Sequence, residues 1–218
     1  MMLPTHALKG MLLAVPVAWI APEFAEIALF AGFLGGIVPD LDMYVGHRKT
    51  LHFPVWYSVL TVPALVIAAI VPTGATVAIA IGLLAAAVHS LSDVLGGGLE
   101  LRPWEGTSDR AVYDHYRKRW IPPRRWIRYD GSPGDFSLSA LFAAPLVLTV
   151  DGTLQAAVVA TVTVAAVYAA VRRRLPDLAE TVLSACAPLC PPHLLERVPA
   201  RYLTEHHHRP RATASRQD

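Results

Sequence analysis

The chain has 218 residues, of which 54% are hydrophobic and 17% are charged, and its formal net charge is +2 at pH 7. Soluble domains average about 25% charged residues, so this composition excludes an ordinary soluble domain and indicates a membrane protein. The length fits one compact bundle better than two domains. The two cysteines, Cys186 and Cys190, do not indicate a disulfide framework and are interpreted as ordinary thiols rather than a metal pair.

Two hydrophobic stretches open the chain, at residues 7–21 and 24–38. Each carries one charged residue, Lys9 in the first and Glu26 in the second, and such residues are costly in a bilayer. These stretches are therefore expected either to span the membrane or to enter the bundle partway. The start of the chain lacks a convincing signal-peptide cleavage site, so the N-terminus is interpreted as retained.

The next two stretches, near 53–72 and 75–95, are the most strongly hydrophobic. Residues 53–92 contain no Asp, Glu, Lys or Arg, and Pro72 and Gly74 mark a turn near the middle. Each half has about 20 residues, which is the length that crosses a bilayer core of about 30 Å. Two transmembrane helices are predicted here.

A last pair of hydrophobic stretches lies at 136–150 and 153–171, joined by the tight turn VDGT. The second is long enough to span, whereas the first is short and needs local thinning of the bilayer or tilting of its neighbours. The predicted fold class is therefore all-α, a polytopic membrane helix bundle with about six hydrophobic helices, at least four of them spanning.

Lys and Arg residues give the expected orientation, because cytoplasmic loops carry an excess of them. They gather at 47–49, in the loop 99–135 and at 172–174. These regions and both termini are predicted to be cytoplasmic, in a multi-pass protein of the cell membrane. The expected domains are an integral membrane domain at 1–175 and a cytoplasmic tail at 176–218, partly disordered because of its polar composition.

The stretch GGIVPDLDMYVGHRKTLHFP, residues 35–54, lies between two predicted hydrophobic helices. It contains two aspartates, two histidines, an arginine and a lysine. Pro39 disfavours helix at Val38, so the segment that follows is expected to be extended. In an extended segment, residues two positions apart point the same way. Asp40 and Asp42 are therefore predicted to face one site.

Histidines and a further aspartate extend this group. His6 begins the first helix, and His47 and His52 precede the third. His89 and Asp93 are four residues apart on the fourth helix, so they share one face. On the expected topology all of these residues lie at one depth on the cytoplasmic side. They are predicted to surround one divalent metal site formed by His6, Asp40, Asp42, His47, His52, His89 and Asp93.

Each of these residues taken singly has a simpler interpretation. An aspartate pair after a helix is usually a solvated turn, and a single histidine within a helix is usually a hydrogen-bonded core residue. Together they favour a metal site, because ionisable residues at membrane depth are costly and usually functional. Imidazole and carboxylate without thiolate form a ligand set suited to zinc, iron or manganese, with zinc as the favoured metal.

Four short motifs occur in order in the first half of the chain. They are Thr-His at 5–6, GGIVPDLD at 35–42, HRKTLH at 47–52 and HSLSD at 89–93. In this order they resemble the membrane-bound, metal-dependent hydrolases, also described as LexA-binding, inner-membrane-associated hydrolases (YdjM-like). The resemblance covers residues 1 to about 105, and the later stretch RRWIRYDGSPGDFSL looks like archaeal members.

The chain departs from the family pattern beside His52. Leu51 separates Thr50 from His52, and Phe53 replaces the usual serine, which argues against a hydroxyl role there and leaves the histidines unaffected. The resemblance implies a hydrolase. A distant likeness of the family to zinc-dependent phospholipase C and nuclease proteins suggests phosphoester chemistry.

The expected reaction is hydrolysis of a phosphoester in a lipid or lipid-linked substrate at the cytoplasmic interface. Asp40 or Asp42 is a candidate general base, and the remaining groups bind metal or orient its ligands. Arg48 is a candidate clamp for an anionic oxygen, for which guanidinium geometry is suited. Simple anchoring at the membrane edge explains Arg48 and Lys49 equally well.

Two other classes of function stay open. A metal-ion transporter is disfavoured, because transport sites usually lie near the bilayer midplane, whereas these residues are expected at its edge. A non-catalytic, metal-binding docking protein would use the basic and aromatic segment 116–128 to bind a partner or nucleic acid. Anchoring to anionic lipid explains the same residues more simply, so nucleic acid is not an expected partner. The oligomeric state is left open.

Overall fold

The computed structural model describes residues 1–186, 190 and 191. The chain divides into two compact units, Met1–Arg173 and Arg174–Asp218, and every predicted site residue lies in the first. In the second unit the described structure is mainly the helix α8, Leu175–Cys186. The tail predicted at 176–218 therefore lies largely outside the described residues.

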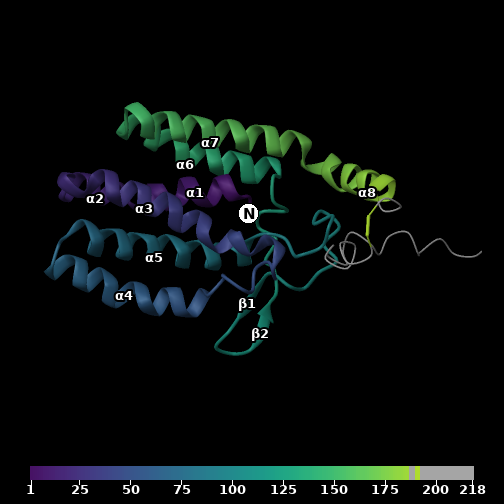
Figure 1. Ribbon diagram of the computed structural model, residues 1–218, viewed down its shortest axis with the longest axis horizontal. Helices are drawn as coiled ribbons and strands as arrows, with labels where there is room; N and C mark the ends of the chain where they lie inside the picture. Colours follow the sequence, from purple (N-terminus) through teal and green to yellow (C-terminus); the bar gives the residue numbers. More distant parts are fainter. Residues whose placement is uncertain (187–189, 192–218) are drawn as a thin grey trace, which may run out of the picture. The chain divides into compact units, whose positions relative to one another are not determined.

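Helices dominate the described chain, and the predicted all-α fold is confirmed (Figure 1). Each of the six hydrophobic stretches predicted from the sequence coincides with helix. The elements in chain order are α1 (Leu3–Leu13), α2 (Val15–Ile20), η1 (Pro22–Phe24), α3 (Ala25–Ile37), η2 (Val38–Tyr44), α4 (Pro54–Ile70), α5 (Gly74–Ser92), η3 (Asp93–Leu95), β1 (Val112–Asp114), β2 (Arg119–Ile121), α6 (Pro133–Thr149), α7 (Gly152–Val171), η4 (Arg172–Arg174) and α8.

Four described stretches are long and apolar enough to cross a membrane, namely Leu3–Ile20, Pro22–Met43, Gly74–Leu95 and Gly152–Cys186. Helices α4 and α6 are also apolar, but each has 17 residues, which make about 26 Å of helix. The two N-terminal stretches, which were expected either to span the membrane or to enter the bundle partway, are among these four candidate spans. Lys9 does not disqualify the first of them, because its ammonium group donates to Ser92 Oγ and to His6 Nδ1.

The helices of the first unit pack in the order α4, α5, α3, α1, α6 and α7, each against the next. Glycines let the three central helices approach closely. A Cβ atom at Gly32 would collide with the carbonyl oxygen of Gly10, and one at Gly36 with that of His6. Small residues at helix contacts are the usual means of close packing in membranes. The contact at Gly36 brings the start of α1 against the end of α3.

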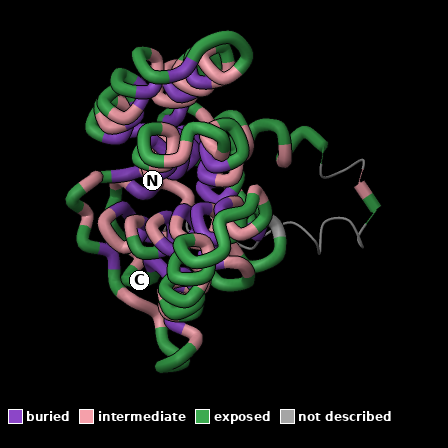
Figure 2. The backbone as a smooth tube through the Cα atoms, turned by 90° about the vertical axis from the view of Figure 1, so that its left-hand side faces the viewer, coloured by how far each residue is buried: buried purple, intermediate pink, exposed green. Residues whose placement is uncertain are grey.

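Apolar side chains occupy both the interior and much of the outer surface. The buried core includes Leu8, Leu29 and Leu146, and buried residues lie on the inner sides of the helices (Figure 2). Large hydrophobic residues are also exposed along the outer faces of α4 and α7, including Val59, Leu60, Val62, Val159, Val164 and Val167. An exposed apolar area of this extent is typical of a surface that contacts lipid or a partner.

One local prediction is wrong, and one local feature was not predicted. The segment after Val38 is not extended: Val38 has φ −50° and ψ −43°, and the 3₁₀ helix η2 runs through Asp40 and Asp42. Pro39 is tolerated because it lies in the first turn, where its missing N–H has no helical partner. The loop 99–135 also contains structure that the sequence did not indicate, an antiparallel pairing of β1 with β2.

Candidate metal centre

Four side chains from four different segments of the chain meet at one end of the central helices. Asp40 comes from η2, His52 from the segment before α4, His89 from the last turns of α5, and Asp93 from the start of η3. One ligand atom from each lies within 4.8 Å of the other three. A His/Asp cluster that can hold a metal ion is therefore present, as predicted.

Four distances between the potential ligand atoms are similar. His52 Nε2 lies 3.5 Å from Asp40 Oδ1 and 3.3 Å from Asp93 Oδ2. His89 Nε2 lies 3.4 Å from Asp40 Oδ1 and 3.6 Å from Asp93 Oδ2. Metal bonds of about 2.1 Å separate neighbouring ligand atoms by about 3.4 Å in a tetrahedral site. Each of these four spacings therefore fits two neighbouring ligands of one divalent ion.

The same atoms have no hydrogen-bond partner. His52 Nε2, His89 Nε2 and Asp93 Oδ2 are buried without one, although buried polar atoms are almost always satisfied. Three such atoms facing one point are costly unless a cation fills it. The donor set, two imidazoles and two carboxylates, suits zinc, iron or manganese. The residues therefore fit a bound divalent metal.

His89 is oriented by the backbone of α3. Its Nδ1 lies 2.7 Å from the carbonyl oxygen of Gly36, so we assign the ring proton to Nδ1. This tautomer leaves a lone pair on Nε2, directed at the cluster. The ring of His6 stacks on the ring of His89, with centroids 3.6 Å apart.

Asp42 supports histidines instead of joining the four ligands. Its Oδ2 accepts from His52 Nδ1 at 3.0 Å, and its Oδ1 accepts from His47 Nδ1 at 3.1 Å. The backbone N–H groups of Arg48 and Leu51 donate to the same carboxylate. The 3₁₀ helix explains the difference from Asp40, because residues two apart in it do not share a face. A carboxylate behind a ligating histidine fixes its tautomer and raises its basicity.

His47, also predicted as a ligand, is outside the group of four. Its ring is perpendicular to that of His52, with centroids 5.8 Å apart, and its side chain is 21% exposed. Its Nδ1 faces Asp42, which leaves Nε2 on the other side of the ring. His47 is thus a partly accessible imidazole beside the cluster.

His6 contacts the cluster through Asp93. Its Nε2 donates to Asp93 Oδ1 at 2.9 Å, while its Nδ1 accepts from Lys9 at 3.3 Å. With both ring nitrogens engaged, His6 orients the carboxylate instead of offering a ligand atom. The hydrogen bonds from Lys9 to His6 and from His6 to Asp93 Oδ1 leave Asp93 Oδ2 directed at the cluster.

Arg48 is buried, with 6% of its side chain exposed, and its Nε lies 3.4 Å from Asp93 Oδ2. A second nitrogen donates to the carbonyl oxygen of Gly97 at 2.8 Å. Its backbone φ is +59°, a left-handed conformation that costs a non-glycine residue about 1–3 kcal/mol. The expected alternative of an anchor at the membrane edge does not fit this burial. The guanidinium group is part of the site.

Several supporting groups were not predicted from the sequence. Thr5 Oγ1 donates to Asp135 Oδ1 at 2.8 Å, and the same carboxylate accepts from the N–H of Met2 at 2.7 Å. Asp135 therefore ties α6 to the start of α1 and positions His6. The Gly36 carbonyl was also missed, although Gly35 and Gly36 adjoin within an apolar stretch, which is a signal of close helix contact.

Three carboxylates surround His52. Burial lowers the pKa of His52, but the interaction with Asp40, Asp42 and Asp93 outweighs it and raises this pKa to about 10. A proton on His52 and a divalent cation would neutralise the same carboxylates. Metal binding at this position is therefore expected to displace a proton.

A cavity of about 560 Å³ lies at the other end of α3, lined by Glu23, Glu26 and Asp151 among others. None of its lining residues belongs to the His/Asp cluster, and it contains no imidazole. The cluster itself is closely packed: His52 and His89 are fully buried, Asp93 is 1% exposed and Asp40 is 8% exposed. Asp40 is the ligand nearest the surface.

Comparison of the chain with protein-family models, curated proteins and solved structures finds no match. The functional interpretation therefore depends on the geometry of the site. That geometry defines an α-helical membrane protein with a buried His/Asp cluster able to bind a metal ion.

Proposed function

We propose that the protein is a membrane-embedded, metal-dependent hydrolase that acts on a phosphoester in a lipid or lipid-linked substrate. The observation that carries this proposal is the convergence of Asp40, His52, His89 and Asp93, three of whose ligand atoms are buried without a partner. Zinc suits a set of two imidazoles and two carboxylates, with manganese or iron as the alternatives.

Hydrolysis is favoured over a purely structural role for the metal. When bound, a divalent cation lowers the pKa of a coordinated water and stabilises negative charge on an attacked oxygen. The motifs that carry the four ligands are those that resemble membrane-bound metal-dependent hydrolases. The ligand nearest the surface, Asp40, gives a substrate a side from which to approach.

His47 and Asp42 supply a candidate for proton transfer. Hydrolysis of a phosphoester removes a proton from the attacking water and delivers one to the oxygen that leaves phosphorus. His47 Nε2 can accept the first, because Asp42 holds Nδ1 protonated, and the imidazolium can then donate the second. Asp42, whose two oxygens already accept four hydrogen bonds, is better suited to hold His47 than to act as the base.

A lipid substrate is supported by the surface next to Asp40. Leu41, Met43 and Val45 are exposed by 63%, 42% and 76%, and the exposed apolar residues Phe30 and Leu34 of α3 and Val38 of η2 precede them in the chain. Acyl chains in contact with these side chains would bring a headgroup toward the cluster without leaving the bilayer. The Lys and Arg placement favours the cytoplasmic side.

The test measures metal and turnover together in the detergent-purified chain. Alanine at His52 or at His89 should remove one equivalent of metal and all activity, whereas alanine at Asp109, whose side chain is 92% exposed, should leave both unchanged. Comparing variants with the parent chain cancels metal held by the histidines of the tail. His47→Gln should retain metal and lower turnover by ~10²–10⁴.

Substrates in the test are phosphomonoester and phosphodiester lipids, each with Zn²⁺, Mn²⁺ and Fe²⁺ in turn. Turnover that a chelator abolishes and metal restores supports the proposal. Metal lost from the two alanine variants without turnover in any combination would favour the alternative, a non-catalytic metal-binding docking protein. Full metal content in both alanine variants would show that His52 and His89 do not bind the metal, and it would contradict the proposed site.

A further inference from the structure

A β-hairpin projects from the loop 99–135 at the lower edge of the molecule in Figure 1. Its strands β1 and β2 pair from Val112 with Ile121 to Asp114 with Arg119. The connecting turn and the start of β2 present consecutive exposed cations, Arg117, Lys118 and Arg119. The side chain of Arg117 is 64% exposed and lies 3.8 Å from its nearest carboxylate, that of Asp114. These cations are largely free of internal partners.

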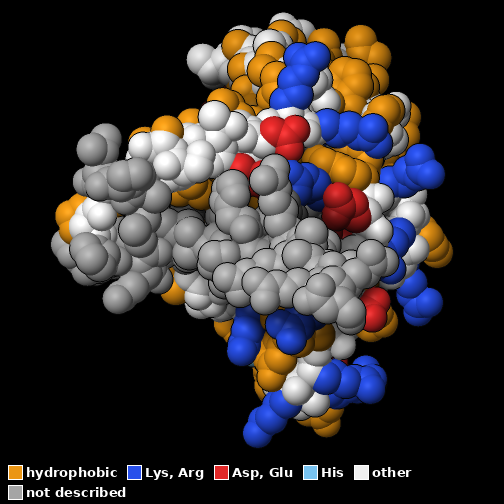
Figure 3. All heavy atoms as spheres, turned by 90° about the vertical axis from the view of Figure 1, so that its right-hand side faces the viewer, with side chains coloured by type: hydrophobic (Ala, Val, Ile, Leu, Met, Phe, Trp, Pro, Cys, Tyr) orange, Lys and Arg blue, Asp and Glu red, His pale blue; other side chains and the backbone are white. Residues whose placement is uncertain are grey.

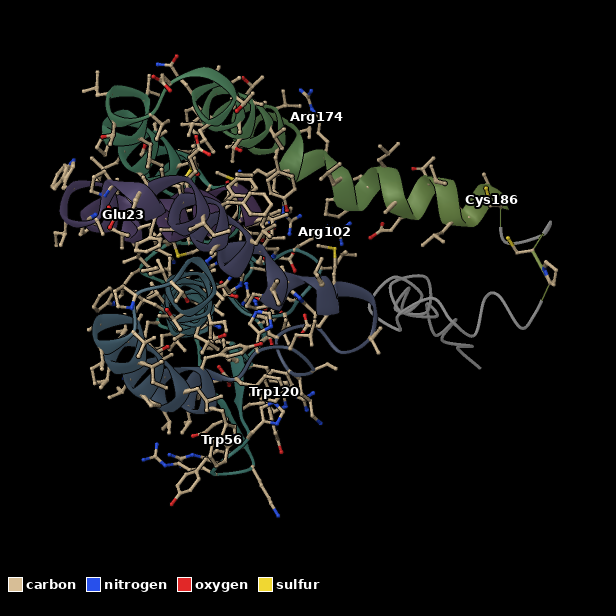
Figure 4. All side chains as sticks on the ribbon, turned by 60° about the vertical axis from the view of Figure 1, so that its left-hand side comes forward. Glu23, Trp56, Arg102, Trp120, Arg174 and Cys186 are labelled. Atoms are coloured by element: carbon tan, nitrogen blue, oxygen red, sulfur yellow. The ribbon has the colours of Figure 1, made fainter. Side chains whose placement is uncertain are left out.

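Aromatic side chains accompany the cations. Tyr116 at the turn is 68% exposed, and its ring lies 6.5 Å from that of Trp56 in the first turn of α4. Arg110 lies over the ring of Trp120 at 5.7 Å. Figure 4 shows Trp56 and Trp120 near one another at this edge, and in Figure 3 Lys and Arg side chains interleave with hydrophobic ones there.

The same edge is continuous with a surface suited to lipid. From Trp56 the helix α4 runs on with exposed apolar residues, including Val59, Leu60 and Val66. Trp and Tyr rings concentrate where an apolar helix ends and headgroups begin. The cations of the hairpin therefore lie beside the level at which headgroup phosphates are found.

The hairpin is also bound to the metal-binding segment. The N–H of Tyr113 donates to the carbonyl oxygen of Arg48 at 3.0 Å, and His115 Nε2 donates to that of Lys49 at 2.6 Å. The ring of His115 packs on Phe53, with centroids 4.5 Å apart. Both carbonyls lie between Asp42 and His52, and Arg48 has the strained backbone. The hairpin holds this strained segment in place.

We propose that the hairpin tip, Tyr116–Arg119 with Trp56, binds anionic phospholipid headgroups and thereby steadies residues 47–52. Anionic lipid, not nucleic acid, is the occupant, because the cations adjoin an apolar helix surface that a bilayer covers. Each Lys or Arg near an anionic membrane surface contributes roughly fivefold in affinity. The proposal concerns the lipid partner and is independent of any hydrolytic activity.

The probe is brominated phosphatidylglycerol, titrated into the full chain held in phosphatidylcholine nanodiscs, with tryptophan quenching as the readout. Quenching should saturate at lower lipid content than with brominated phosphatidylcholine, and Trp56→Phe should remove most of the difference. The double variant R117Q/K118Q should weaken phosphatidylglycerol binding by roughly 25-fold. The double variant R124Q/R128Q removes two other exposed cations of the same loop. It should change the affinity for phosphatidylglycerol less than threefold.

The second readout is amide hydrogen exchange of residues 47–52. Phosphatidylglycerol should slow it in the parent chain and in R124Q/R128Q, but not in R117Q/K118Q. Equal quenching by the two lipids, or equal losses in the two double variants, would overturn the proposal. Tighter binding of a single-stranded oligonucleotide than of phosphatidylglycerol at 150 mM salt, lost in R117Q/K118Q, would also overturn it.

Discussion

The His/Asp cluster and the hairpin use the same kinds of side chain in opposite ways. In the cluster, Arg48 is buried, has a left-handed backbone and lies against Asp93. In the hairpin, Arg117 is mostly exposed and lies at 3.8 Å from Asp114. A buried charge must have its partners built by the fold, because removing one leaves the other unpaired in a low dielectric. An exposed charge is solvated and stays available to an outside partner.

The cluster depends on contacts that admit no extra atoms, and Gly36→Ala should produce the largest effect. The new Cβ would meet the His6 carbonyl oxygen and would displace the Gly36 carbonyl from His89. We expect loss of bound metal and a decrease of about 3 kcal/mol in the free energy of unfolding.

Metal analysis and thermal melting of the purified chain measure both effects. Gly74→Ala is the matched control, since nothing lies within 4 Å of a Cβ there, and it should melt like the parent chain. A Gly36→Ala variant that kept its metal would show that the close contact between α1 and α3 is not needed for the site.

Substitution of Arg48 in the cluster and of Arg117 in the hairpin compares how much a buried and an exposed arginine contribute to stability. Arg48→Gln removes the cation beside Asp93 and leaves a buried carboxylate unpaired, so we expect destabilisation of about 3 kcal/mol in metal-free protein. Arg117→Gln removes an exposed pair and should change stability by less than about 1 kcal/mol.

Melting of both arginine variants after dialysis against a chelator gives the comparison. Added metal should recover part of the loss in Arg48→Gln, because a cation then neutralises Asp93, and should not affect Arg117→Gln. Equal shifts for the two variants would mean that burial of Arg48 has no energetic consequence.

A pH-dependent effect is expected at Asp130, whose side chain is 23% exposed and so lies between the two regions in exposure. Burial raises the pKa of Asp130, but the charge of Arg172 and hydrogen bonds from Arg172 and Tyr168 outweigh it and leave this pKa below its ordinary value. The folded state therefore binds a proton less readily than the unfolded state. The resulting stability is present above the unfolded pKa and is lost as pH falls through the folded pKa.

Asp130→Asn should accordingly lower stability by about 1 kcal/mol at pH 7, and the difference from the parent chain should shrink below about pH 4. Thermal melts of both proteins from pH 7 to pH 3 test the sign. Asp109→Asn, an aspartate with a 92% exposed side chain, is the control and should melt like the parent chain throughout. A difference that grew toward acid pH would contradict the assignment.

Much of the candidate site was accessible from the sequence, because its ligands belong to short local motifs. The spacing of His89 and Asp93 is a helix repeat, and both residues are among the four ligands. The same reasoning failed for Asp40 and Asp42, because it assumed an extended chain after Pro39. Which of His6, His47, His52 and His89 presents Nε2 to the cluster depends on groups distant in sequence, such as the Gly36 carbonyl beside His89 and Asp93 beside His6.

The sequence by itself determined the helices and the kinds of side chain in the His/Asp cluster, since hydrophobicity over about 20 residues and the types of ionisable side chain are local properties. Only the tertiary structure decided the division between ligands and supporting residues, the burial of Arg48 and the existence of the hairpin. The strands have three residues each, too few for a pattern. Their pairing is stabilised by contacts with residues 48–53 that are more than 60 positions away in the chain, which no local pattern encodes.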